Sequence, residues 1–566
     1  MTAQNPTNQL SGAEAMVRML EAHGVRHVFG LCGDTSLPFY DAFQRIGGSM
    51  RHILARDERS AAYMADAYAR VTGKVGVCEG PSGGGATYIL PGVVEANESS
   101  IPVLAITTDV ATSSRGRFAL TELDQEALFR PLAKFTRVID RGGKLPRYVR
   151  AAFTQMTTGR PGAAHLSFPF DVQKEPVDKA EVWADAALGA YPARRLAPDP
   201  DAVTEAAALL KSARRPLFIC GGGVVIARGE AELQALAEAL GAAVATTVSG
   251  QGSIPETHPL AVGVVGSNGG SVETREAVEA ADLVMFIGCR AGSVTTERWR
   301  HPAPGKAKIV HIDVDPATIG VNYKTDAAVA GDAKLALGAL ILAVAGHKAG
   351  NDPRATLAAL KAKKRATFDA LARSTEAPIR PERLIAALQS VLPEDAVIVA
   401  DPGTPCPYFS AHYEVRRPGR HFITNRAHGA LGYSMSAAVG AQVGRPDKKV
   451  VAVMGDGSFG FTAGEMETVV RLKLPITFVV VSNAVFGWIK AGQKYGFGER
   501  YFSVDFDRTD HARVAEAFGV KAWKVEDPNE LTTTLKRAIE TDGPTLVDVI
   551  SQPLQDAKAP VSEWVA

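Results

Sequence analysis

An aspartate and an asparagine stand at the ends of two neighbouring apolar segments late in the chain. The segment VVAVMGDG carries Asp456 between two glycines, and ITFVVVSN ends at Asn483. Carboxylate and amide oxygens suit Mg²⁺, which takes few protein ligands together with phosphate oxygens, and glycines let the backbone approach a ligand closely. The pair predicts a metal-bridged diphosphate site. On spacing alone, a Gly-Asp-Gly turn with an unrelated asparagine at a strand end is an equal alternative.

Two strands and one helix are expected to bring this pair together. KKVVAVMGDG predicts a strand that ends at Met454, TAGEMETVVRLK predicts a helix with Thr462 as its N-cap, and ITFVVVSN predicts a second strand. The crossover makes the two strands parallel, so both carboxyl ends open at one edge of the sheet. Because open α/β sheets bind ligands at that edge, Asp456 and Asn483 are expected to converge there.

The same alternation of apolar runs and Ala-rich helical stretches extends along the chain and predicts α/β domains with doubly wound, mostly parallel sheets. The runs are HVFGLCG, VGVCEG, VLAITTDV, AAHLSFPF, PLFICGGG, LVMFIGCR, KIVHIDVD, AVIVADPG, KKVVAVMGDG, ITFVVVSN and TLVDVIS. Polar or Lys/Ala-rich seams at about 175–195 and 346–375 divide the chain into three domains, 1–180, 195–345 and 376–566. No internal repeat at a fixed period is visible.

Composition excludes several classes of partner. The 566 residues hold 62 Lys and Arg against 61 Asp and Glu, a net charge of +1, so no overall field favours nucleic acid or an anionic membrane. The five cysteines are scattered singly, as in a reduced compartment. The first residues lack the pattern of a signal peptide, and no apolar run reaches about 18 residues. We therefore expect an unprocessed, soluble, cytoplasmic protein that acts on a small molecule.

Several motifs in order resemble one family nearly end to end. The GDG motif, followed by a helix and a strand that ends in Asn, is similar to the cofactor motif of thiamine diphosphate (ThDP) enzymes. RDERSAAYMADAYARVTGKVGVCEGPSGGGATY, TTGRPGAAHLSFPFDVQ, HIDVDPATIG and HGALGYSMSAAVGAQVGRPDKKVVAVMGDGS resemble acetolactate synthase and its relatives. This resemblance implies pyrimidine-binding, central Rossmann-like and diphosphate-binding domains. It also implies that Asp456, Asn483 and the carbonyl of Val485 bind Mg²⁺.

The resemblance implies a catalytic carboxylate at Glu58. In the family, a glutamate bonds the aminopyrimidine of ThDP and promotes loss of the C2 proton, while the cofactor serves as the electron sink. Such a group works best when it is sheltered from water, because burial raises its pKa. Many relatives have His-Glu-Gln here, whereas this chain has Asp57-Glu58-Arg59. Without the family, Glu58 is a solvated charge at a helix start.

Further cofactor contacts follow from the same resemblance. Leu431 falls where the family has an apolar wedge that bends the cofactor, and Gly429 falls where a carbonyl accepts its amino group. Backbone donors to the diphosphate are expected from Gly403, Thr404, Gly457 and Ser458. In the family, the glutamate and the metal site of one active site come from different chains. We therefore expect at least a homodimer, and a homotetramer is common among relatives.

The central domain has glycine-rich turns without a complete dinucleotide fingerprint. CGGGVV, GSNGGS, GCRAGS and HIDVDP could bind a nucleotide, with Asp313 or Asp315 near a ribose. Arg290 matches an arginine that contacts the nucleotide in several relatives. Relatives use this domain for FAD, for ADP or CoA, or for no ligand. The synthase's Phe-Asp-Asp-Arg segment is absent here, which weakens the expectation that this domain binds FAD.

The chain departs from the synthase around the expected substrate pocket. Thr121 and Glu122 replace the synthase's Gln-Glu, Gly492 stands where it has a Trp, and Glu499 stands where it has a Gly. Glu122 and Glu499 are the candidate acid groups of a wider pocket. These differences favour a lyase or decarboxylase that splits a 2-hydroxyacyl-CoA or a 2-oxo acid through a carbanion at C2 of ThDP. The alternatives are an acetolactate synthase-type carboligase of 2-oxo acids and a flavin-dependent, pyruvate oxidase-like oxidoreductase.

Overall fold

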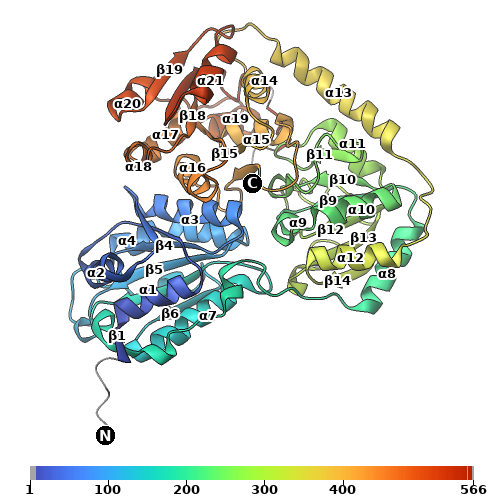
Figure 1. The fold of residues 1–566 in the computed structure, drawn as a ribbon. Coiled ribbons are helices and arrows are strands. Elements are labelled where there is room, and N and C mark those ends of the chain that lie inside the picture. The colour runs from blue at the N-terminus through green and yellow to red at the C-terminus, as the bar shows by residue number, and fades with distance from the viewer. Residues whose placement is uncertain (1–7, 558, 564–566) are drawn as a thin grey trace. The chain divides into compact units, whose positions relative to one another are not determined.

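The computed structural model describes residues 8–557 and 559–563. It contains three six-stranded sheets, each flanked by helices (Figure 1). The chain divides into two compact units. The first contains Met1–Arg194, Ala427–Pro446 and Thr462–Leu472, and the second contains Arg195–Arg426, Asp447–Phe461 and Lys473–Ala566. The predicted class of three α/β domains is confirmed.

The sheet of the first unit has the order β3-β2-β4-β5-β7-β6, and all of its pairings are parallel. Its strands are β2 (His27–Gly30), β3 (Arg51–Leu54), β4 (Gly76–Gly80), β5 (Val103–Asp109), β6 (Phe135–Val138) and β7 (Ala164–Pro169). A short antiparallel ribbon pairs β1 (Gln9–Ser11) with β8 (Pro176–Asp178). The helices are α1 (Gly12–Ala22), α2 (Leu37–Ile46), α3 (Glu58–Thr72), α4 (Gly84–Tyr88), α5 (Leu90–Glu98), α6 (Gln125–Phe129), α7 (Leu145–Thr157), α16 (Tyr433–Gly444) and α18 (Glu465–Arg471).

Helix α3 is the central packing element of this unit. Asp57 caps its start by accepting from Arg59 N, and the helix ends at Gly73, whose φ of 68° lies in the left-handed region. Alanines and Gly440 let α16 lie directly against it, because a Cβ on Gly440 would be 1.9 Å from the carbonyl oxygen of Met64. The close approach leaves nearly every residue of α3 buried.

A buried ion network connects α3, α5 and α16. Arg70 bonds Asp66 at 2.9 Å and Glu95 at 3.0 Å, and the hydroxyl of Tyr433 donates to Asp66 at 2.6 Å. The other oxygen of Glu95 accepts from His428 N at 2.7 Å. Arg70 is shared by the two carboxyl groups, and the Tyr433 hydroxyl and the His428 amide supply further donors, so the network holds the segment that leads into α16.

The first sheet of the second unit has the order β11-β10-β9-β12-β13-β14, which is the order of a Rossmann fold. Its strands are β9 (Pro216–Cys220), β10 (Ala243–Thr246), β11 (Ala261–Val264), β12 (Leu283–Ile287), β13 (Lys308–Asp313) and β14 (Ala327–Ala330). The accompanying helices are α8 (Pro200–Ser212), α9 (Gly222–Ala227), α10 (Glu230–Leu240), α11 (Val272–Ala280), α12 (Ala333–Ala343) and α13 (Arg354–Ala372).

The last sheet has the order β16-β15-β17-β18-β20-β19, again with parallel pairings. Its strands are β15 (Val397–Ala400), β16 (Phe422–Thr424), β17 (Val450–Gly455), β18 (Thr477–Ser482), β19 (Lys521–Val525) and β20 (Thr545–Ile550). The helices that complete this region are α14 (Pro381–Val391), α15 (Pro405–His412), α17 (Asp456–Thr462), α19 (Gly487–Gly496), α20 (His511–Ala517) and α21 (Leu531–Glu540).

The parallel pairing of β17 with β18 confirms the predicted βαβ unit. The helix predicted after Thr462 is α18, but the predicted N-cap is wrong, because Gly464 is the N-cap of α18 and Thr462 is the last residue of a separate helix, α17, that begins at Asp456. Asp456 accepts from Gly457 N at 2.8 Å, so the aspartate itself satisfies a free amide at the helix start. Within residues 8–557 and 559–563, no helix combines the length and apolar character needed to cross a membrane.

Candidate active site

The carboxylate of Asp456 lies directly beyond β17 and is bonded to the segment that follows β18. Asn483 N and Ala484 N donate to its Oδ2 at 2.7 and 2.6 Å, and Gly457 N donates to Oδ1. The two strand ends therefore do converge, as the sequence predicts. Burial raises the pKa of Asp456, and the three amide bonds oppose that rise.

The residues around Asp456 suit a hard cation. The side-chain amide nitrogen of Asn483 is buried and has no hydrogen-bond partner among the described residues, and a Cβ on Gly455 would have no atom within 4 Å. Val485 is buried two residues after Asn483. The buried carboxylate and the open space beside the strand end fit a bound cation, and the unpartnered side-chain N–H of Asn483 suits an acceptor such as a phosphate oxygen.

The predicted diphosphate contacts lie at the carboxyl ends of neighbouring strands. Gly403 and Thr404 follow β15, while Gly457 and Ser458 follow β17, and β15 pairs with β17. Thr404 and Ser458 are buried, and the hydroxyl of Thr404 approaches Gly487, which follows β18. The arrangement gives one edge of the last sheet several backbone amides near Asp456.

Glu58 is the first residue of α3 and is only 7% exposed. Its carboxylate lies against the turn after β4, because a Cβ on Gly85 would be 3.1 Å from its Oε1 and one on Gly80 would be 3.2 Å from its Cγ. Burial raises the pKa of Glu58, and the charges of Asp57 and Glu79 add to that rise. The solvated helix-start charge weighed from sequence does not describe this environment.

Gly429 and Leu431 lie in the loop that leads into α16. Gly429 has a φ of 75°, which a glycine adopts without strain, and a Cβ there would meet nothing within 4 Å. Leu431 is half-buried, and His428 is tied to Glu95 as described above. Glu58 and this loop thus belong to the first unit, while Asp456 and Asn483 belong to the second.

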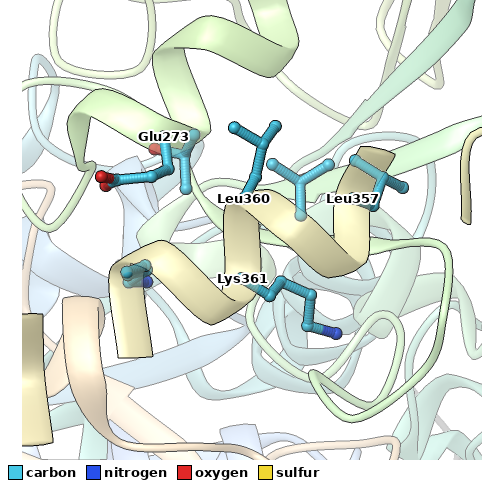
Figure 2. A pocket seen from close by; sticks show the side chains of 7 residues that line it. Glu273, Leu357, Leu360 and Lys361 are labelled. Carbon is cyan, nitrogen blue, oxygen red and sulfur yellow. The ribbon is translucent and has the colours of Figure 1, made fainter. Parts of the chain in front are cut away.

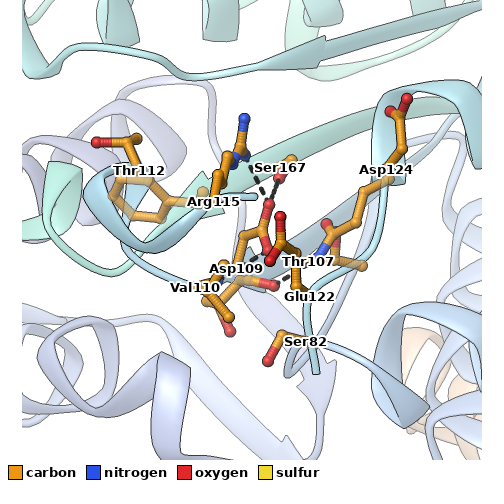
Figure 3. A network of polar contacts seen from close by, with 12 residues as sticks. Ser82, Thr107, Asp109, Val110, Thr112, Arg115, Glu122, Asp124 and Ser167 are labelled. Atoms are coloured by element: carbon orange, nitrogen blue, oxygen red, sulfur yellow. Dashed lines mark hydrogen bonds and ion pairs between the residues drawn. The ribbon is translucent and has the colours of Figure 1, made fainter. Parts of the chain in front are cut away.

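Glu122 lies in the loop after β5, in a polar network that Figure 3 shows. Its Oε1 accepts from Gly116 N at 2.6 Å, and the neighbouring Thr121 bonds the hydroxyl of Ser82 at 2.7 Å. The network centres on Asp109, which bonds Arg115 at 2.7 Å, Ser167 at 3.3 Å and Val110 N at 2.8 Å (Figure 3).

Sequence reasoning missed two buried carboxyl groups, Asp109 and Glu79. Asp109 ends β5 and Glu79 is the second-last residue of β4, and burial raises the pKa of both. Glu79 lies inside a strand of small and apolar residues, and Asp109 ends a strand that begins with an apolar run. An acidic residue in a strand that is expected to be buried indicates a carboxyl group with specific partners, and this could have identified both residues from the sequence.

Glu499 is exposed in the loop that follows α19, with a φ of 59°. A left-handed backbone favours glycine, so a glutamate at this position carries a conformational cost. Arg290 is exposed after β12. The nearby glycine turns pack on each other, since a Cβ on Gly221 would lie 2.1 Å from the carbonyl oxygen of Gly288.

Figure 2 shows a pocket in the second unit that none of these residues lines. It lies between α11 and α13 and is lined by Val262, Glu273, Thr274, Leu357, Leu360, Lys361 and Lys364. The ammonium of Lys361 is not available to a ligand in the pocket, because it donates to the carbonyls of Glu256 and His258 at 2.8 and 3.0 Å. It ties α13 to the central sheet region.

Three family models match the chain in order. They are the N-terminal TPP binding domain of thiamine pyrophosphate enzymes at residues 10–128, the central domain at 203–340 and the C-terminal TPP binding domain at 401–549. The chain is similar to a probable acetolactate synthase large subunit from Methanococcus aeolicus, with 35% identity over 96% of this chain and 92% of that protein. It is also similar to the acetolactate synthase large subunits of Parasynechococcus marenigrum (34% identity, 96% and 88%) and Haemophilus influenzae (31%, 94% and 92%).

Proposed function

We propose that this chain, which belongs to the thiamine pyrophosphate enzymes and within them to the relatives of the acetolactate synthase large subunit, joins two 2-oxo acids. The synthase name of relatives that align over 96% of the chain supports this carboligase activity. These relatives favour the carboligase over the 2-hydroxyacyl-CoA lyase that the pocket differences suggested. The structural observation that best supports a ThDP-dependent reaction is the convergence of Asp456 and Asn483 at the sheet edge.

Asp456, the side-chain amide of Asn483 and the carbonyl of Val485 would hold a Mg²⁺ ion that bridges the protein to the diphosphate. Amides of the loop after β15 and of the first turn of α17 would bind the remaining phosphate oxygens. When bound, thiamine diphosphate supplies an electron sink for cleavage and formation of bonds next to a carbonyl carbon. The chain's task at this edge is to fix the diphosphate.

Glu58 would hold and release the proton at its own carboxyl oxygen. Its burial excludes water and raises its pKa, so the carboxyl retains a proton to a higher pH than an exposed glutamate does. Gly429 and Leu431 would present a carbonyl acceptor and an apolar support from the loop that Glu95 holds. Glu122 and Glu499 remain predicted acid groups near the substrate, and Arg290 remains a predicted nucleotide contact in the central domain.

We expect at least two copies of the chain to assemble, because the family completes each active site with two chains. Sedimentation of the purified protein at several concentrations measures this. Only a monomer across all concentrations, in a protein that is nevertheless active, would contradict it.

The test supplies purified protein with ThDP, Mg²⁺ and pyruvate and measures acetolactate. Separate reactions supply lactoyl-CoA and 2-hydroxyisobutyryl-CoA and measure release of formyl-CoA. Acetolactate without acyl-CoA cleavage supports the carboligase, and the reverse result supports the lyase. A flavin spectrum in the purified protein, with oxygen consumed on pyruvate, would support the oxidase instead.

A further inference from the structure

Helix α18 contacts the segment that connects β3 to α3 and leads into Glu58. The carboxyl group of Glu465, the first residue of α18, accepts a hydrogen bond from Arg56 N at 2.8 Å. Arg471, the last residue of the same helix, donates through Nη2 to the carbonyl oxygen of Leu54 at 2.6 Å. Leu54 ends β3, so the two bonds fix the backbone just before α3 begins.

Glu465 is a buried carboxyl group with a donor at each oxygen. It is 1% exposed, its Oε1 accepts from Arg56 N, and its Oε2 accepts from the hydroxyl of Thr468 at 2.8 Å. Ser60, in the first turn of α3, is a further hydrogen-bond partner of this carboxyl group. The hydroxyl of Ser60 also accepts from Ser436 at 2.9 Å. The partners of Glu465 therefore lie on α3 as well as on the segment before it.

The amide of Arg56 depends on this acceptor. Asp57 is the N-cap of α3, so the amide of Arg56 precedes the helix and no carbonyl of that helix can accept from it. A buried amide without an acceptor is costly. An apolar residue in place of Glu465 would therefore favour a displaced connection in which this amide finds another partner.

Glu58 lies between the points that Glu465 contacts. It is the first residue of α3, two positions after Arg56 and two before Ser60. The direction of its side chain therefore follows the backbone that Glu465 fixes. That direction brings its Cγ and Oε1 against the turn after β4. Because a displacement of about 1 Å in a reacting group can lower a rate by about 10²-fold, the position of this segment matters to any proton transfer at Glu58.

We propose that Glu465 is a positioning residue for Glu58. By accepting from Arg56 N and Ser60, it holds the start of α3 in the place where the Glu58 carboxyl group meets the turn after β4. Thr468 orients the Glu465 carboxyl group for this contact. The catalytic consequence rests on the proposed function, whereas the hold on the segment does not.

The first measurement is amide hydrogen exchange in the full-length, cofactor-free protein. Glu465→Ala removes the acceptor of Arg56 N, so exchange in peptides that cover residues 54–60 should become faster by about tenfold. Glu465→Gln keeps an oxygen acceptor and should restore most of the protection. Peptides of α7, in the same unit, should not change. Unchanged exchange at 54–60, or an equal rise in α7, would overturn the proposal.

A matched control and a milder variant accompany this measurement. Glu21→Ala removes a carboxyl group that pairs with Arg18 at the surface of α1, and it should leave the peptides of residues 54–60 unchanged. Thr468→Val keeps the shape of the side chain and removes the donor to Glu465. It should raise exchange at 54–60 by less than Glu465→Ala does, and it tests the proposal if Glu465→Ala does not fold.

The second measurement asks whether Glu465 acts through Glu58. Glu465→Ala should lower kcat by about tenfold or more, with little change in KM or in the affinity for ThDP. In Glu58→Gln, where the proton transfer is already lost, the same substitution should change kcat by less than about twofold, since residues that act as a unit are not additive. Equal losses in both backgrounds would overturn the positioning role. Absence of acetolactate formation would count against the proposed function, and hydrogen exchange would still decide whether Glu465 holds the segment.

Discussion

The sheet of the first unit and the last sheet of the second unit connect their strands in the same order. In each, the third strand along the chain, β4 or β17, lies next to the fourth, β5 or β18. Their carboxyl ends carry acidic or amide residues in both sheets, with Glu79 and Asp109 in one and Asp456 and Asn483 in the other. The partners of these residues, however, differ.

The partners determine what each end can bind. Glu79 is held by a phenol and an imidazole, and Asp109 is held by Arg115, so these carboxyl groups already have side-chain donors. Asp456 accepts hydrogen bonds from three backbone amides, those of Gly457, Asn483 and Ala484. Amides orient a carboxylate without neutralising it, which leaves its charge for a cation. The same strand order therefore carries carboxyl groups bonded by side chains in one sheet and a carboxylate bonded by backbone amides in the other.

The largest expected effect is the loss of cofactor in Asp456→Ala. Without the carboxylate, the metal loses its one charged ligand in this site, and retention of ThDP should weaken by more than ~100-fold. Calorimetric titration of ThDP with Mg²⁺ measures this. Asp542→Ala, at an exposed position of the same unit, is the control and should bind normally. Normal affinity in Asp456→Ala would remove Asp456 from the metal site.

Glu58→Gln should separate chemistry from binding. The amide preserves shape but cannot exchange the proton, so turnover should fall by at least ~10²-fold while ThDP affinity stays near that of the wild type. Steady-state kinetics and the same calorimetric titration test this variant beside Asp456→Ala. Near-normal turnover would exclude Glu58 from the mechanism.

Gly440→Ala tests the contact between the corresponding helices of the two sheets, because α3 follows β3 and α16 follows β16. The added methyl would overlap the carbonyl of Met64, so we expect a loss of about 1–3 kcal/mol in the free energy of unfolding. Gly338→Ala in α12, where a Cβ meets nothing within 4 Å, is the control and should gain about 0.5–1 kcal/mol. Equal urea midpoints for the two variants would contradict the close packing.

The smallest expected effect is at Glu499. Because this residue has a left-handed backbone, Glu499→Gly should stabilise the protein by up to about 1 kcal/mol, provided that the added freedom of the unfolded chain does not cancel the relief. Glu499→Gln separates this effect from charge. A fall in turnover in Glu499→Gln would show that the carboxylate serves the reaction, whereas unchanged turnover would identify an exposed loop charge.

Most interior strands were predictable and the edge strands were not. All eleven apolar runs identified from the sequence form strands, because a strand buried on both faces reads as a continuous apolar segment. The missed strands include β3, β6, β16 and β19 at the sheet edges. Edge strands such as RHIL and KAWKV contain exposed basic residues and therefore do not read as continuous apolar runs. The short, Ala-rich β10 was missed inside a sheet.

Some site residues could be found from local sequence, and others could not. Asp456 and Asn483 were found because a βαβ unit dictates where two strand ends meet, and this rule needs only local sequence. The exact domain limits and the roles of Glu122, Glu499 and Arg290 stay predictions. Glu79 was overlooked because its meaning depends on Tyr40 and His52, which approach it from other elements.

The sequence by itself determined the α/β class, the interior strands, and the convergence of Asp456 with Asn483, since hydrophobic burial and crossover handedness act locally along the chain. Only the tertiary structure decided that Glu58 is buried against the turn after β4, that α16 packs on α3, and that Tyr40 and His52 contact the buried Glu79 carboxyl group. Burial and electrostatic coupling depend on groups that are distant in sequence, and those groups meet only when the chain has folded.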